Sequence, residues 1–198
     1  MTYSKAPMLL ISGAILACAG CDSPTAAVNT AANDTSVSTA AADHSDPIKS
    51  AMAAAPESIS GGATIVQAAA DGSMKTLREG KSGWTCMPDN PVTPGRDPMC
   101  MDANALKWAQ AWMGHKDPPA NNVGLMYMLA GGSDASNMDP FGTKPEGGAE
   151  WVETGPHVMV VGSDSLNALY PSVPKPDVSK PYVMFGGTPY AHVMIPIK

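Results

Sequence analysis

Two histidine–methionine pairs carry the sharpest chemical signal in this sequence. His157 stands two positions before Met159, and His192 stands two positions before Met194. Because residues two apart on a β-strand share a face, each pair presents an imidazole and a thioether together. Those ligands suit Cu(I), so the four side chains would form a soft-metal site if the two strands were neighbours in register. The ordinary alternative is that both segments are core strands.

The same histidines support a second hypothesis, an enzyme with an acid–base site. His157 and His192, together with Asp164 or Asp134, would form such a site if the fold brought them together. The sequence contains no G-x-S-x-G nucleophile motif and no H-E-x-x-H metalloprotease motif. We therefore expect a binding or structural module and keep the enzyme as an alternative.

A polar, glycine-rich segment over residues 131–148 is the best candidate for ligand contacts. It follows an apolar stretch and is long for a connection inside a compact domain. Loops of this kind often contact ligands, although a solvated surface loop is the simpler explanation. The first candidates for polar contacts within it are Ser133, Asp134, Ser136 and Asn137.

Cys86 and Cys100 are the only cysteines outside the N-terminal region. In an exported protein, an even pair favours a disulfide over a metal site. Closing a loop of this length stabilises a protein by up to about 3 kcal/mol, and four prolines inside the loop reduce that gain. We expect a structural disulfide here.

The N-terminal residues 1–20 read as an export signal. An apolar run of about ten residues follows Lys5, which is too short for a bilayer span of roughly 20 residues. The small residues before Cys21 resemble the end of a bacterial lipoprotein signal, in which the cysteine is lipidated. Cys18 is a second candidate, and cleavage by an ordinary signal peptidase is a third possibility.

Residues 21–55 are expected to form a flexible tether rich in Ala, Thr and Ser. Its first part, up to residue 46, is too poor in large apolar side chains to offset the entropy of ordering. A lipid at Cys21 would then hold the following domain on a membrane, in the periplasm or at the outer surface. Residues 56–198 are left for one globular domain.

Composition limits the remaining function classes. The chain has 198 residues and a formal net charge of -6, and a single domain fits that length. Its only arginines are Arg78 and Arg96, so it lacks the basic face that nucleic-acid binding requires. Fourteen methionines are an unusual excess.

Hydrophobic patterning predicts an α+β domain with a mostly antiparallel sheet. Asp46-Pro47 predicts a short helix that ends by Pro56, and residues 163–170 predict another. The main helix is expected over 103–113, with an apolar face that includes Trp108 and Trp112. That face would pack on the sheet, although it could also serve as an aromatic shelf for a ligand. The expected strands are residues 63–68, 74–79, 84–87, 124–130, 157–161, 182–185 and 191–195.

Four long motifs resemble a family of secreted bacterial proteins with no known activity. They read GWTCMPDNPVTPGRDPMC, YMLAGGSDASNMDP, GPHVMVVG and GTPYAHVMIP. The resemblance covers about residues 56–198 and implies export, without a cofactor or a catalytic residue. The sequence therefore predicts an exported, lipid-anchored binding or structural module, with enzyme and copper protein as the alternatives.

Overall fold

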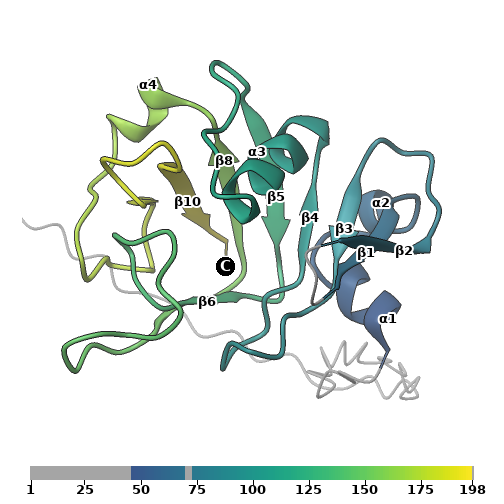
Figure 1. Cartoon of the computed structure of the whole chain (residues 1–198), viewed down its shortest axis with the longest axis horizontal. Coiled ribbons are helices and arrows are strands. Elements are labelled where there is room, and N and C mark those ends of the chain that lie inside the picture. Colours follow the sequence, from purple (N-terminus) through teal and green to yellow (C-terminus); the bar gives the residue numbers. More distant parts are fainter. Residues whose placement is uncertain (1–45, 70–72, 198) are drawn as a thin grey trace, which may run out of the picture. The chain divides into compact units, whose positions relative to one another are not determined.

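The computed structural model describes residues 46–69 and 73–197 (Figure 1). The predicted signal, the lipidation candidates Cys18 and Cys21 and most of the tether lie outside these residues. Among the helices that are described, none is long and apolar enough to cross a bilayer.

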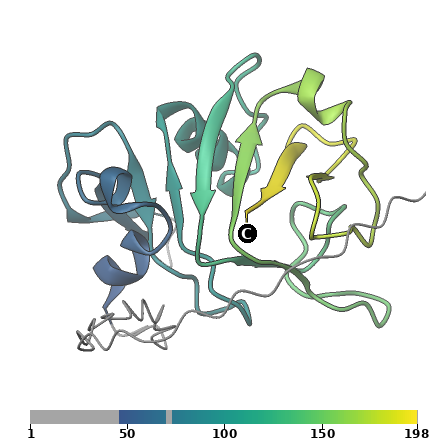
Figure 2. The same ribbon diagram turned by 180° about the vertical axis from the view of Figure 1, so that it is seen from behind.

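An eight-stranded sheet forms the framework, in the order β2-β1-β3-β4-β5-β8-β10-β9. Neighbouring strands run antiparallel, except that β1 and β3 are parallel. This confirms the predicted α+β fold and its hairpin of β1 and β2 (Figures 1 and 2). The strands are β1 (Thr64–Ala68), β2 (Met74–Arg78), β3 (Thr85–Met87), β4 (Met99–Met101), β5 (Gly124–Met128), β8 (His157–Val161), β9 (Tyr182–Met184) and β10 (His192–Pro196).

A second, two-stranded sheet lies within and just after the segment expected to be a loop. It pairs β6 (Gly132–Asp134) with β7 (Val152–Thr154). Sequence patterning misses both strands because each has three residues and β6 consists of residue types that are rare in strands. Residues 133 and 134 are therefore held by backbone pairing rather than lying in a free loop.

Within residues 46–69 and 73–197, four helices accompany the sheets: α1 (Pro47–Met52), α2 (Glu57–Ser60), α3 (Ala103–Met113) and α4 (Asp164–Asn167). The predicted cap of α1 is present, since Asp46 Oδ1 accepts from the backbone N–H of Ile48 at 2.9 Å. Ala51 and Ala54 are fully buried. Residues 47–55, which a domain boundary at residue 56 would assign to the tether, are thus part of the packed domain.

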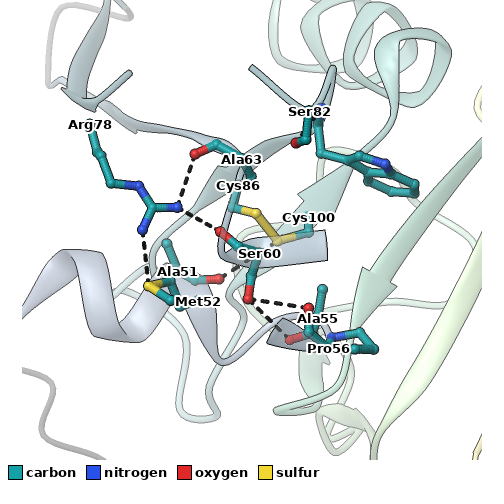
Figure 3. Close-up of a disulfide and its surroundings, with 11 residues drawn as sticks. Ala51, Met52, Ala55, Pro56, Ser60, Ala63, Arg78, Ser82, Cys86 and Cys100 are labelled. Atoms are coloured by element: carbon teal, nitrogen blue, oxygen red, sulfur yellow. Dashed lines mark hydrogen bonds between the residues drawn. A yellow bond between two sulfur atoms is a disulfide. The ribbon is translucent and has the colours of Figure 1, made fainter. Parts of the chain in front are cut away.

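A disulfide joins Cys86 on β3 to Cys100 on β4, as the sequence predicts (Figure 3). The two residues are directly opposite each other in the sheet, which brings their Cα atoms to 4.0 Å, closer than most disulfides. Both side chains are fully buried in a cluster with α1. The Arg78 guanidinium donates to the carbonyls of Ser60 and Ala63 beside this cluster, at 2.6 and 3.0 Å.

α3 lies on the opposite face of the sheet, across β4 and β5 (Figures 1 and 2). Asp102 caps the helix, because its Oδ1 accepts from the backbone N–H of Ala105 at 2.7 Å. The other carboxylate oxygen accepts from the N–H of Leu125 at 2.9 Å, which ties the cap to β5. Gly124 makes this approach possible, since a Cβ there would lie 2.2 Å from the nitrogen of Ala105. Trp108 is buried against the sheet, as predicted.

Candidate functional site

Methionines form rows across the sheet face that α3 covers. Met126 on β5 is directly opposite Met159 on β8, and Met159 is directly opposite Met194 on β10. On the other side of β5, Met126 is opposite Met101 of β4. All four side chains are buried and, because side chains alternate along a strand, they share one face.

A cavity of about 790 Å³ lies between this face, α3 and the segments that follow β3 and β6. Its wall contains four large aromatic side chains, from Trp108, Trp112, Trp151 and Phe185. The indole N–H of Trp112 donates to the carbonyl of Pro140 at 2.8 Å, which joins α3 to the segment after β6. Eight of the methionines also line the cavity: Met87, Met99, Met113, Met126, Met128, Met159, Met184 and Met194.

Among the described residues that line the cavity, the only charged side chains are aspartates. They are Asp89, Asp97, Asp134 and Asp139, and no described lysine or arginine lines the wall with them. Asp97 is 8% exposed and accepts hydrogen bonds from the backbone N–H of Ser133 at 2.6 Å and from the Thr93 hydroxyl. Burial raises the pKa of Asp97; the two hydrogen bonds oppose that shift, and the nearby charge of Asp89 adds to it.

Asp134 lies close to Asp97 and shares a face of β6 with Gly132. A Cβ on Gly132 would lie 3.1 Å from Met128 Cε and 3.2 Å from His157 Cε1, so this face of β6 is turned towards the sheet. The Asp134 carboxyl accepts no hydrogen bond from any residue of the described ranges. Burial and then the charge of Asp97 raise its pKa to about 7.

Tyr182 and Thr154 extend this polar cluster on the side of β9 and β7. Their hydroxyl oxygens lie 2.6 Å apart, and both residues are buried. Burial raises the pKa of Tyr182 to about 12; the bond to Thr154 opposes the shift, and the Asp134 charge adds to it. The phenol therefore stays protonated at neutral pH.

His157 and His192 lie on the same sheet face but at opposite ends of the β8–β10 pair. His192 is opposite Val161, whereas His157 is opposite Pro196. Four residue steps separate these positions, or roughly 13 Å along the strands. The structure therefore does not bring the two histidines together: His192, Met159 and Met194 line the cavity, and His157 is not part of its wall.

Both histidines are neutral, with the proton on Nδ1. Nδ1 of His157 donates to the carbonyl of Gly155 at 2.7 Å, and Nδ1 of His192 donates to the carbonyl of Tyr190 at 2.9 Å. Burial lowers the pKa of both imidazoles, to about 4 for His192, where the hydrogen bond to Tyr190 partly opposes the shift and the charge of His157 adds to it. Each Nε2 presents a lone pair that no described residue satisfies.

Trp108 adds an unsatisfied donor to the cavity wall beside the His192 acceptor. The side chains of Trp108 and His192 are 3% and 1% exposed, and their rings meet edge to face with centroids 5.0 Å apart. Neither Trp108 Nε1 nor His192 Nε2 has a hydrogen-bond partner within the described part of the chain. Buried polar atoms without hydrogen-bond partners are rare in proteins, and both of these atoms are inaccessible to solvent.

The ligand contacts predicted in the 131–148 segment divide into two groups. Ser133, Asp134 and Ser136 line the cavity. Asn137 is fully buried and has a structural role, since its Nδ2 donates to the carbonyls of Val173 at 2.7 Å and Val183 at 3.1 Å.

Asp164, the other predicted acid–base partner, is exposed in the first turn of α4 and does not line the cavity.

Asp97 lines the cavity but was not among the residues predicted from the sequence. It follows a proline-rich stretch, where no periodicity marks a buried position. The pairs Met99/Met101 and Met126/Met128, whose members are two residues apart, are a sequence signal that could have identified this sheet face.

No cluster of three or more His, Cys, Asp or Glu side chains is placed to hold a metal ion within residues 46–69 and 73–197. Comparisons with protein-family models, curated proteins and solved structures find no match to this chain. The cavity and its side chains therefore carry the functional argument.

Proposed function

We propose that this domain is an exported binding module whose cavity takes a small, largely apolar molecule. The observation that carries the proposal is the cavity of about 790 Å³, whose wall includes eight methionine and four large aromatic side chains. That volume falls in the range of small-molecule sites, roughly 300–1,000 Å³. Thioether side chains adapt their shape to an occupant, which suits a binding surface better than a rigid core.

The proposed location follows from the N-terminal residues. Lipidation at Cys21 would anchor the protein, and the tether would hold the domain away from the membrane surface. The export signal, the Ala/Thr/Ser-rich tether and the disulfide of the folded domain support this proposal, since disulfides persist in oxidising compartments.

Calorimetric titration with adamantanol, a compact neutral apolar probe, tests the binding function. We expect saturable binding with one site, and we expect Ala135→Phe to weaken it because Ala135 lines the cavity. The matched control is Ala111→Phe, on α3 but outside the cavity wall. Absence of saturable binding to the wild-type protein, or equal affinity in both folded variants, contradicts the proposal. Circular dichroism and unfolding midpoints verify that the variants fold.

A soft-metal site is the second candidate, and the placement of His192 favours it. His192, Met159 and Met194 line the same cavity, with Met126 directly opposite Met159. One imidazole and several thioethers form a donor set that suits Cu(I). The candidate site differs from the symmetrical one that the sequence suggested, because His157 has no part in it.

Competition for Cu(I) against a chromophoric chelator tests this second function. His192→Ala should lose copper, whereas His157→Ala should retain it, and the two variants remove the same side chain from opposite ends of one strand pair. Equal retention by both variants, or no retention by the wild-type protein, eliminates the site.

A further inference from the structure

The aspartates of the cavity point to the charge of its occupant. Asp97 and Asp134 lie close enough to raise the pKa of Asp134 by their repulsion, and neither forms an ion pair with a described lysine or arginine. Burying two ionised carboxyls among apolar side chains costs free energy, unless a positive charge or a shared proton compensates their charge. A cation in the cavity would remove that cost.

Asp97 and Asp134 differ in their capacity to accept a hydrogen bond from a ligand. Asp97 already accepts from Ser133 and Thr93, so its oxygens are held in place by the protein. Asp134 accepts no hydrogen bond from a described residue, and its backbone is fixed by pairing with Val152. Asp134 is therefore the carboxylate with free acceptor capacity on a rigid element.

The aromatic side chains of the cavity wall suit the apolar body of such an occupant. Trp108 and Trp112 stack with centroids 6.2 Å apart and planes 22° apart, and Trp112 stacks on Phe185 at 6.5 Å and 27°. Together with the methionine side chains, these stacked rings form an apolar wall for the body of the ligand.

We propose that the cavity selects an organic cation, a compact apolar body that carries a protonated amine, with Asp134 as the carboxylate that receives the ammonium group. The inference rests on the proposed binding function and adds the charge of the ligand. The apolar body occupies the space between the methionine rows and α3, and the ammonium group lies at the end of the cavity near β6.

Three probes with the same apolar cage test the charge preference: adamantylammonium, adamantanol and adamantanecarboxylate. We expect the ammonium to bind the wild-type protein about tenfold more tightly than the alcohol, and the carboxylate to bind least. Equal affinity for ammonium and alcohol overturns the cation inference and leaves the binding function intact. If no probe binds, both proposals fail.

Asp134→Asn tests the residue assignment, because asparagine keeps the size of the side chain and removes its charge. We expect the ratio of ammonium to alcohol affinity to fall about tenfold, with little change in alcohol affinity, which also verifies that the cavity is intact. Glu153→Gln, which removes an exposed carboxyl from the paired strand β7, should leave the ratio unchanged. An unchanged ratio in Asp134→Asn overturns the role of this residue.

Discussion

Replacing Asp134 with asparagine should stabilise the ligand-free domain, and the gain should increase as the pH rises. Burial and Asp97 raise the pKa of the folded-state carboxyl from 3.8 to about 7. Between these two values the folded protein holds a proton that the unfolded chain has released. The free energy of unfolding therefore falls as the pH rises through this window. Asparagine has no charge to bury, so the variant avoids that loss.

The pKa difference sets the magnitude of the effect. At about 1.36 kcal/mol per pH unit, a pKa of about 7 in place of 3.8 corresponds to at most about 4 kcal/mol above pH 7. Roughly 2–3 kcal/mol of this develops between pH 5 and pH 8. Because Asp134 is only partly buried, solvent screens its charge, and we expect about 1–2 kcal/mol to be observed.

Urea unfolding of the wild-type protein and Asp134→Asn at pH 5 and pH 8 measures this difference. The titratable groups that surround Asp134, namely Asp97, Tyr182 and His157, are present in both proteins, so their own direct contributions largely cancel. Glu153→Gln is the control, since it removes an exposed carboxyl from the neighbouring strand. An Asp134→Asn variant whose advantage is the same at both pH values, or smaller at pH 8, refutes the reasoning.

Three further predictions concern the disulfide, the main helix and the anchor. Replacing both Cys86 and Cys100 with alanine should lower the free energy of unfolding by about 1–3 kcal/mol without changing the circular dichroism spectrum; an unchanged midpoint would show that the bridge adds no stability. Trp108→Ala should lower the free energy of unfolding, measured with denaturant, by about 3–5 kcal/mol. Trp112→Ala should lower it less, because the Trp112 ring is only partly buried. A larger loss for Trp112→Ala than for Trp108→Ala would contradict the packing. Cys21→Ser should release the protein from membranes in fractionation, whereas an unmodified mature N-terminus by intact mass would exclude lipidation.

The main features of the fold could be predicted because local patterns report them. The helix over 103–113 has an N-cap at Asp102 and a closing glycine at Gly114, both of which the structure contains. Short apolar runs bounded by Gly or Pro mark most strands of the large sheet. The strands β6 and β7 could not be predicted, since three residues are too few to show a period and their pairing joins positions about 20 residues apart.

The candidate site was only partly predictable for a related reason. The sequence shows that Met159 and Met194 each share a strand face with a histidine, but it does not show the register between strands. That register places Met159 opposite Met194 and separates His157 from His192. The carboxyl pair depends on contacts between a proline-rich loop and a short strand, which no local pattern encodes.

The methyl resonances of the methionines measure occupancy of the cavity most directly. In a protein labelled with ¹³C at the methionine methyl groups, adamantylammonium should shift the resonances of cavity residues such as Met126, Met159 and Met194 along one saturable curve. Met52, which packs in the cluster around the disulfide and does not line the cavity, serves as the internal control and should move little. Saturable shifts confined to the cavity methionines are the result that the account predicts. Shifts restricted to methionines outside the cavity, or no saturable shift at any methionine, would contradict it.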